Sequence, residues 1–326
     1  MIRETIKKYP VHLRKLEALS RRLNPNHINF QKVVDNFGRQ KSGYQGERVL
    51  DYHLSYLPEK EYVILHGLRF FDGIGFFQID VLILSKYYFL ILEVKNIKGT
   101  LLFDPEFNQL IRIEQEKEEA FPDPLLQVDR QKRLLKNFLS AHINITDIPI
   151  YTLVVISNPS TIIKATTAKK QILQRVIHSA KLHLKIEELN KLYVKEILSA
   201  SEIQKVGKQL VKKNQTLDSD LLQYYEIKRT DILKGVQCPE CLNIPMCRFH
   251  SNWVCPKCNN KSRMAHIPAL VDYSLFFGTC ITNRQARNFL QVSSNNVVRY
   301  LLSSLDLPTT GKNKSKTYNL AYLLSK

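Results

Sequence analysis

The chain has 326 residues, and 44% of them are hydrophobic. This length allows two or three domains, and this hydrophobic content allows buried cores, which excludes a globally disordered chain. The formal net charge of +18 indicates a polyanionic partner, either nucleic acid or an anionic membrane surface. No uncharged apolar run approaches the ~18 residues of a membrane-spanning helix, and the N-terminus shows no signal-peptide pattern. We therefore expect a cytoplasmic protein that binds nucleic acid and has no membrane partner. The sequence leaves its oligomeric state open.

Residues 1–40 are basic and show a helical pattern. Leu13, Leu16, Leu19 and Leu23 recur at helical spacing. Six basic residues surround them, namely Lys7, Lys8, Arg14, Lys15, Arg21 and Arg22. The pattern is typical of a packing helix with a solvated basic face, and it also fits an added surface for phosphate contacts.

The Gly43–Gly46 segment predicts a break in the chain, and a helix follows it. In that helix Glu47, Leu50 and Leu54 share one face, so Glu47 lies in line with a buried apolar stripe. A carboxylate in that position needs a partner, a cation or a metal.

The segment 62–156 alternates between predicted strands and one predicted helix. Strands are expected at residues 62–65, 76–84, 88–96, 100–103, 110–113 and 148–156. A short connection at 85–87 makes the second and third of these a hairpin, and the acidic residues 114–119 predict a solvated loop. Pro122-Asp123-Pro124 opens a predicted helix that carries Gln127 and Gln131, and this crossover makes the last strand parallel to an earlier one. Residues 164–234 are predicted to be mostly helical, with a hinge near 214–222.

The two strands of the hairpin carry Asp80, Glu93 and Lys95. Because side chains alternate along a strand, Glu93 and Lys95 point to the same face, and Asp80 on the partner strand can lie beside Glu93. Two close carboxylates cannot both stay ionised without a cation, and Mg²⁺ binds one or two carboxylates together with phosphate oxygens. The lysine could orient a water or stabilise a transition state. An ordinary surface salt bridge has the same spacing, but the strongly apolar strands favour a functional site.

A longer series of residues resembles a known family. Its first part, Gly46-Glu47, opens a helix, and its second, Gln78-Ile79-Asp80, lies on a strand. The third part is Leu92-Glu93-Val94-Lys95-Asn96 with Gly99. The fourth is Asp123-Pro124 with Gln127 on a later helix. Over residues 40–160 this series resembles the NERD (nuclease-related domain) family of the PD-(D/E)xK nuclease superfamily. The resemblance implies an α/β fold with a restriction-endonuclease-like mixed sheet flanked by helices. It also implies roles: Asp80 and Glu93 as ligands of a catalytic Mg²⁺ or Mn²⁺, Lys95 as the catalytic lysine, Glu47 as an accessory acid, and Gln127 as a polar residue of the motif helix.

Cysteines crowd into the short stretch 238–258, which in a reducing compartment indicates metal binding sooner than disulfides. Two CxxC knuckles are the usual source of four thiolates for a tetrahedral Zn²⁺. The predicted ligands of a structural zinc are Cys238, Cys241, Cys255 and Cys258. Inside the loop, Cys247 and His250 are predicted not to bind, with Cys247 the one serious substitute. Arg248, Lys257, Lys261 and Arg263 surround Trp253, which fits either a ribbon that contacts nucleic acid or a zinc-stapled linker.

Residues 278–326 predict two helices and a basic hairpin. The helices at 281–290 and 295–302, joined by a turn, resemble a helix-turn-helix, and 311–318 looks like a basic wing. The second helix would enter a major groove. Nucleic-acid contacts are therefore predicted for Arg284, Arg287, Asn295, Asn296, Arg299, Lys312, Lys314 and Lys316. The alternative is a generic helical hairpin used for packing.

These patterns predict five parts. They are a basic helical N-terminal extension (1–40), a NERD-like nuclease domain (41–160), a helical segment or linker (161–235), a zinc ribbon (236–267) and a winged-helix-like unit (278–326). The leading hypothesis is a metal-dependent nuclease that hydrolyses phosphodiester bonds of DNA. The rival is a non-catalytic DNA-binding or regulatory protein that keeps a nuclease fold, and RNA is a further possible substrate.

Overall fold

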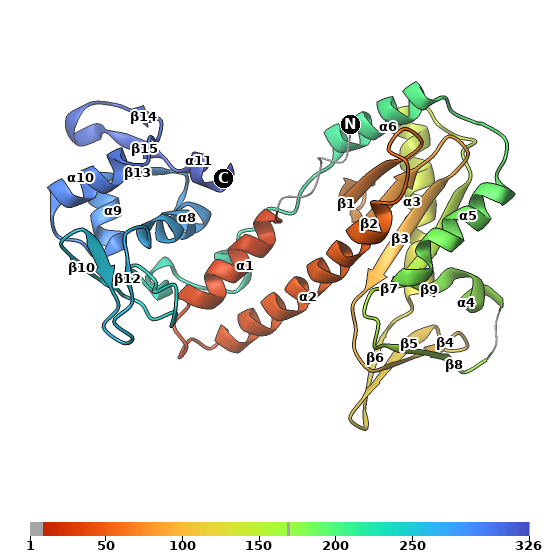
Figure 1. Ribbon diagram of the computed structural model, residues 1–326, viewed down its shortest axis with the longest axis horizontal. Coiled ribbons are helices and arrows are strands. Elements are labelled where there is room, and N and C mark those ends of the chain that lie inside the picture. Colours follow the sequence, from red (N-terminus) through yellow and green to blue (C-terminus); the bar gives the residue numbers. More distant parts are fainter. Residues whose placement is uncertain (1–8, 168–169, 326) are drawn as a thin grey trace. The chain divides into compact units, whose positions relative to one another are not determined.

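A computed structural model describes residues 9–167 and 170–325 of the chain. These residues divide into two units (Figure 1). Unit 1 contains Tyr9 and residues 39–217, and unit 2 contains residues 10–38 and 218–325. Within the two described ranges, no helix is both long enough and apolar enough to cross a membrane.

Unit 1 is built on a mixed five-stranded sheet. In order across the sheet its strands are β1 (Val63–Phe71), β2 (Phe76–Leu84), β3 (Phe89–Lys95), β7 (Ile150–Ile156) and β9 (Val176–His178). The pairs β1–β2 and β2–β3 are antiparallel, whereas β3–β7 and β7–β9 are parallel. The hairpin predicted at 76–96 and the parallel strand predicted at 148–156 are both confirmed.

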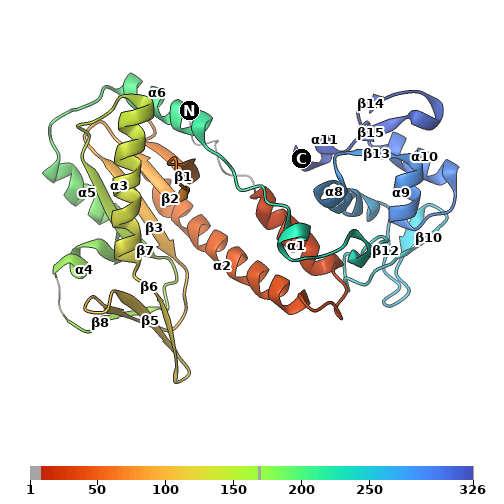
Figure 2. The same cartoon turned by 180° about the vertical axis from the view of Figure 1, so that it is seen from behind.

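Helices cover both faces of this sheet. Helices α3 (Pro124–Ile143) and α6 (Ala200–Lys213) pack on one face, where Leu135 and Phe138 meet Leu82 and Ile91 of the strands. On the other face lie α2 (Phe30–Leu54) and α5 (Leu182–Leu192), whose apolar side chains pack on Leu90 and its neighbours. Helix α3 lies in front of the strands in Figure 2 and behind them in Figure 1. The short helices α4 (Lys170–Arg175) and η1 (Ser179–Lys181) adjoin β9.

A second sheet has four strands, and the strands of the two sheets correct two predictions. Its order is β6 (Lys117–Pro122), β5 (Gln109–Glu114), β4 (Thr100–Asp104) and β8 (Ile162–Ala165). The acidic stretch predicted as a loop therefore contains strand β6, which tolerates charged residues because it is an exposed edge. The stretch 164–234, predicted as mostly helical, contains the end of β8 and all of β9, and each of these strands pairs in parallel with its neighbour.

Helix α2 is continuous, so the predicted break at Gly43–Gly46 is wrong. A glycine inside a helix costs about 1 kcal/mol relative to alanine, which by itself does not end a helix. At Gly46 a close contact explains the residue, because an added Cβ would lie 2.5 Å from Cβ of Asn96 and 2.8 Å from Oγ of Ser157. Gly46 thus lets α2 approach the end of β3 closely.

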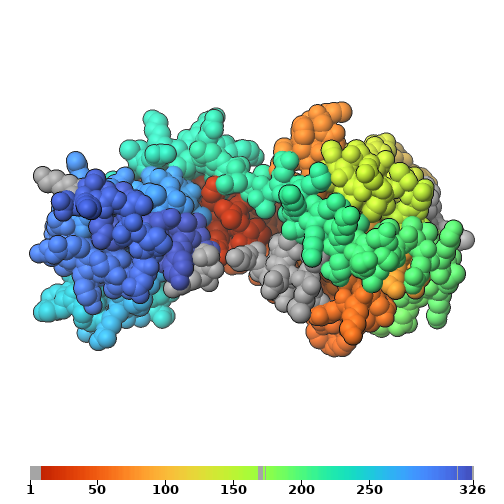
Figure 3. Space-filling view, turned by 90° about the horizontal axis from the view of Figure 1, so that it is seen from above, coloured from red at the N-terminus to blue at the C-terminus, as the bar shows by residue number. Residues whose placement is uncertain are grey.

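Unit 2 combines the N-terminal helix with the C-terminal third of the chain, and Figure 3 shows α1 in red beside the blue C-terminal elements. Its helices are α1 (Val11–Arg22), α7 (Leu221–Tyr224), η2 (Arg229–Asp231), α8 (His266–Phe277), α9 (Asn283–Leu290), α10 (Asn295–Ser303), η3 (Asn313–Ser315) and α11 (Ala321–Ser325). Its strands form two small sheets, one of β10 (Cys247–Phe249), β11 (Asn252–Val254) and β12 (Lys261–Ser262), the other of β13 (Cys280–Thr282), β15 (Thr317–Asn319) and β14 (Thr309–Thr310).

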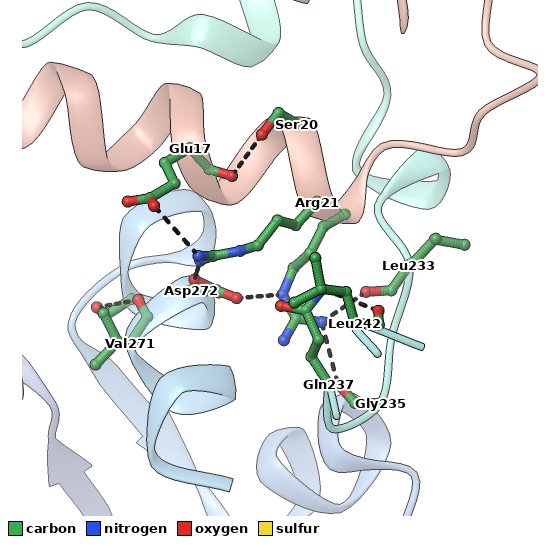
Figure 4. A network of polar contacts seen from close by, with 11 residues as sticks. Glu17, Ser20, Arg21, Leu233, Gly235, Gln237, Leu242, Val271 and Asp272 are labelled. Carbon is green, nitrogen blue, oxygen red and sulfur yellow. Dashed lines mark hydrogen bonds and ion pairs between the residues drawn. The ribbon is translucent and has the colours of Figure 1, made fainter. Parts of the chain in front are cut away.

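Helix α1 packs into unit 2 through the leucines that the helical pattern predicts to be buried. One of its basic residues, which the same pattern predicts to be solvated, is buried as well. Arg22 is fully buried instead of solvated. Its Nε donates to Oδ2 of Asp272 at 2.6 Å, and its NH1 group donates to the carbonyls of Leu233 and Gly235. Arg21 also pairs with Asp272, at 2.9 Å (Figure 4). Arg22 is buried because it joins α1, α8 and the segment 233–235 at one point. Lys7 and Lys8 lie outside the described residues.

Candidate functional site

Asp80 lies where β2 separates from β3. The two strands pair only over Val81–Leu84 of β2. Beyond that ladder the backbone N–H of Val94 donates to Oδ2 of Asp80 at 2.9 Å. The carboxylate thus replaces a backbone acceptor of the neighbouring strand, which holds it next to Glu93.

The alternation of side chains is interrupted at the same place. Ile79 and Leu82 pack in one core, although residues three apart in a regular strand face opposite sides. Across from Asp80 on β1, Gly67 has a φ of 55°, a value that favours glycine. The sheet therefore departs from regular geometry at the residue that the sequence predicts as a metal ligand.

Glu93 is almost completely buried and is held from two sides. Nζ of Lys95 lies 2.7 Å from Oε1 of Glu93, as expected for two residues on one face of a strand. Nε2 of Gln131 donates to Oε2 at 2.8 Å. Lys95 also donates to Oε1 of Gln127 at 3.1 Å, so α3 contacts both charged residues of β3.

The start of α3 sets the position of these two glutamines. Asp123 caps the helix by accepting from the backbone N–H of Leu125 at 2.8 Å, and Pro124 occupies the first turn. Gln127 and Gln131 are four residues apart and so lie on one face of the helix. The cap therefore fixes where α3 begins, and this start places the side-chain amides of Gln127 and Gln131 toward β3.

Glu47 approaches the site from α2. Burial, followed by the charges of Asp80, Glu93 and Asp51, raises the pKa of Glu47 to about 8. The close contact at Gly46 places this part of α2, and Asn96 secures it by donating to the carbonyl of Ser42 at 2.8 Å.

The site holds more negative charge than its one lysine offsets. Burial and the charge of Glu93 raise the pKa of Asp80 to about 7, against the opposing effects of the Val94 N–H and Lys95. Carboxylate oxygens are the ligands that Mg²⁺ and Mn²⁺ prefer, and a divalent cation would relieve this repulsion. The donor set of Asp80 and Glu93 therefore fits such a cation, with Glu47 close enough to feel the same charge.

Sequence reasoning assigned no role to Gln131, Asn96 or Gly46. Gln131 could have been found from its position one helical turn after Gln127, because both then face the same strand. The partners of Asn96 and Gly46 lie far away in the sequence, and no local pattern signals them.

The four predicted cysteines converge in unit 2. The sulfur atoms of Cys238, Cys241, Cys255 and Cys258 all lie within 4.8 Å of one another, and all four thiols are free. Among residues 9–167 and 170–325, this is the only group of three or more potential metal ligands. Four thiolates suit a tetrahedral Zn²⁺ with no open position, so the cluster could bind a structural zinc. Cys247 is exposed and stands outside the group.

Trp253 is not the exposed aromatic ring that its basic neighbours suggest. It is completely buried, and its Nε1 donates to Nδ1 of His266 at 3.3 Å. The guanidinium of Arg248 lies 5.3 Å from the centre of its ring. The ring therefore belongs to the core of unit 2 and has no free face for stacking on a base.

The C-terminal residues predicted to contact nucleic acid lie on three elements. Arg284 and Arg287 are on α9, Asn295, Asn296 and Arg299 are in α10, and Lys312 and Lys316 flank η3 in the following hairpin. The side chain of Lys314 lies outside the described residues. In α10 the three side chains are exposed on the first turn and a half, after Ser294 caps the helix.

The comparison with protein families agrees with this geometry. Residues 42–157 match the family model of the nuclease-related domain, NERD. This range contains Glu47, Asp80, Glu93, Lys95 and Gln127 together with most of the five-stranded sheet. The chain therefore contains a nuclease-related domain, within a mixed α/β fold. No curated protein and no solved structure gives a significant match to the chain.

Proposed function

We propose that this protein is a metal-dependent nuclease that hydrolyses phosphodiester bonds of DNA. The observation that carries the proposal is the contact of Lys95 with the buried Glu93, beside Asp80, within a nuclease-related domain. Gln127 and Gln131 already bind this pair, but an ammonium has three N–H donors and a carboxylate about four acceptor sites, so both groups can take further partners. A substrate phosphate and a cation supply such partners.

Each residue of the site has a proposed role. Asp80 and Glu93 would hold a divalent cation, which when bound would activate a water and neutralise charge on the phosphate. Lys95 stabilises the charge that develops on the reacting phosphate, and Gln127 holds the lysine through its amide oxygen. Glu47 acts as an accessory acid on the side of α2.

Unit 2 would bind the DNA in this proposal. The helices α9 and α10 with the following hairpin would act as a winged helix-turn-helix, with Asn295, Asn296 and Arg299 of α10 in the major groove. Lys312, Lys314 and Lys316 would contact phosphates from the hairpin. A zinc ion on the four cysteines would stabilise the segment that precedes these helices.

The test is a cleavage assay on plasmid and linear DNA with Mg²⁺ or Mn²⁺. The wild-type protein should nick or degrade DNA, and Asp80→Ala, Glu93→Ala and Lys95→Ala should each abolish cleavage while leaving DNA binding intact. Lys98→Ala is the matched control, because it removes an exposed lysine from the same segment. The proposal fails if the triple variant cleaves as well as the wild type.

The second candidate is a non-catalytic DNA-binding protein that keeps the nuclease fold. It is favoured by one observation, that both carboxylate oxygens of Glu93 are already bound by Lys95 and Gln131. Sequence-specific binding with no metal-dependent cleavage of DNA or RNA, tested on a panel of both, would decide for it.

A further inference from the structure

An open groove of about 780 Å³ lies in unit 2 between α9, the end of α8 and the segment 229–234. Its charged lining residues are Arg229, Lys234, Arg284 and Arg287, and all four are cationic. None of the described residues that line it is acidic, so the groove favours an anion. The half-buried Arg287 donates from its NH1 group to the carbonyl of Ser293 at 3.2 Å, which fixes its guanidinium at the edge of the groove.

The floor of the groove is aromatic. Tyr273, Phe277 and Phe289 line it, and the ring of Phe277 lies 5.2 Å from that of Tyr273 and 5.8 Å from that of Phe289. The guanidinium of Arg229 stands 5.9 Å from the centre of the Phe277 ring. Only Phe277 of these three rings is partly exposed, so it is the ring that a flat ligand can reach.

The buried ion pair of α1 holds the segment that carries two of the four cations. Arg22 donates to the carbonyls of Leu233 and Gly235 on either side of Lys234, and its guanidinium lies 4.9 Å from the centre of the Phe289 ring. The backbone N–H of Leu233 donates in turn to the carbonyl of Arg22 at 2.7 Å. The cationic rim is therefore fixed against the aromatic floor before any ligand binds.

We propose that this groove binds a nucleotide unit, with its phosphate on the cationic rim and its base on Phe277. Guanidinium groups match the geometry of phosphate oxygens, and bases stack on aromatic rings regardless of sequence. The exposed amide of Asn288 lies beside the floor, where it can reach the edge of a base, whereas the amide of Gln285 is held by Thr282 in the cap of α9. A base in a duplex is stacked on both sides, so the ligand is a free nucleotide or an unpaired nucleotide of a strand.

This site differs from the carboxylate site of unit 1 and does not require that site to cut. It also gives Arg284 and Arg287 a role other than duplex contact, because both line the groove together with residues outside α9 and α10. Arg229 and Lys234 belong to the groove alone, and substituting them tests the groove without touching the proposed duplex-binding set.

The experiment measures binding of a labelled single strand of about 12 nucleotides, close to the site sizes of known single-strand binders, without added divalent metal. The variant Arg229→Gln/Lys234→Gln should bind the strand about tenfold more weakly, and its slope of log affinity against log salt should fall by about 1.4, because each lost phosphate contact removes about 0.7. The matched control is Lys261→Gln/Arg263→Gln, which removes two exposed charges elsewhere in unit 2 and should leave the slope unchanged. Equal slopes for the two double variants would overturn the proposal.

Two further arms test the base and identify the source of the nucleotide. Phe277→Leu should weaken single-strand binding while leaving blunt-duplex binding unchanged, and unfolding followed by the fluorescence of Trp253 checks that unit 2 still folds. Wild-type affinity of Phe277→Leu for the strand would overturn the stacking part of the proposal. Competition by a free deoxynucleoside monophosphate would show that a free nucleotide is enough, whereas competition by oligonucleotides alone would identify a strand.

Discussion

Gln131 donates a hydrogen bond from Nε2 to Oε2 of Glu93 at 2.8 Å, and its own Oε1 is buried without a hydrogen-bond partner among the described residues. A buried carboxylate held in this way has one orientation, because both of its oxygens are fixed by neighbours. Gln131 is therefore a positioning residue for Glu93.

Replacing Gln131 by leucine should lower metal-dependent cleavage about 10- to 100-fold, the usual cost of removing a partner that orients a metal ligand. The Mg²⁺ concentration needed for half-maximal activity should rise, which a purely structural role would not produce. Asn137→Leu, an exposed change on the same helix, is the control. Unchanged metal dependence in Gln131→Leu would contradict this role.

The glycines of α2 offer a matched pair of substitutions. Gly46→Ala should destabilise unit 1 by about 1–3 kcal/mol, because its Cβ would collide with Asn96 and Ser157. At Gly43 no atom of the described residues lies within 4 Å of an added Cβ, so Gly43→Ala should stabilise the helix by about 0.5–1 kcal/mol. Denaturant unfolding followed by circular dichroism measures both changes. A stabilising Gly46→Ala would mean that α2 does not approach β3 as described.

The buried ion pair of unit 2 should be sensitive to the loss of one partner. Arg22→Ala leaves the carboxylate of Asp272 buried with only Arg21, and we expect a loss of about 3–5 kcal/mol. The single tryptophan of the chain lies buried in unit 2, so its fluorescence reports the unfolding of this unit. Arg284→Ala should change stability by less than about 0.5 kcal/mol, as is usual for an exposed site. Equal stabilities of the two variants would remove the stabilising role of Arg22.

The stability of unit 2 should also depend on pH through His266. Burial, aided by the charge of Arg248, lowers the pKa of His266 to about 4, whereas the unfolded value is near 6.5. Between these values the unfolded chain binds a proton that the folded chain lacks. Stability is therefore full above pH 6.5 and falls as the pH drops toward 4, by on the order of 3 kcal/mol.

His266→Asn is neutral throughout this range, so its unfolding free energy should depend less on pH than that of the wild type. Any loss of metal from the cysteines in acid affects the unfolding free energy of both proteins. The difference between the two free energies therefore reports the titration of His266. Parallel pH curves for the two proteins would refute the assignment.

Metal analysis should find about one zinc per chain, because the four sulfur atoms converge on one point. Cys255→Ser should lose the metal and destabilise unit 2, and a chelator should do the same to the wild type. Cys247→Ser should keep the metal, since this exposed thiol lies outside the group. Retention of zinc by Cys255→Ser but not by Cys247→Ser would identify a different ligand set.

Local patterns were sufficient for much of unit 1. The alternation along β3 predicted that Glu93 and Lys95 share a face, and the Asp123-Pro124 pair predicted the start of α3. The order of the motifs also predicted the nuclease-related domain that the family match identifies. The first two features depend on neighbours a few residues apart, which is the range over which periodicity and capping act.

Other features depend on partners that no local pattern contains. The helical pattern assigned Arg22 to a solvated face, but its partner Asp272 is 250 positions away. Trp253 looked like a stacking platform among basic residues, yet tertiary packing buries it against His266. The glycines of α2 predicted a break in the helix. Gly46 instead allows a close contact with Asn96 and Ser157, which are distant in the sequence, so no local pattern indicates it.

The order in which the chain is synthesised has a consequence for unit 2. Helix α1 is made before residues 39–217 of unit 1, but Asp272 and the apolar side chains between Leu221 and Ile232 that pack on α1 are made only after them. Domains fold as they emerge, so the nuclease-related domain can fold while Leu16, Leu19 and Leu23 of α1 still lack most of the side chains that cover them. A fragment of unit 1 for expression should therefore begin near residue 39, because including α1 without residues 218–325 would expose an unmatched leucine face and promote aggregation.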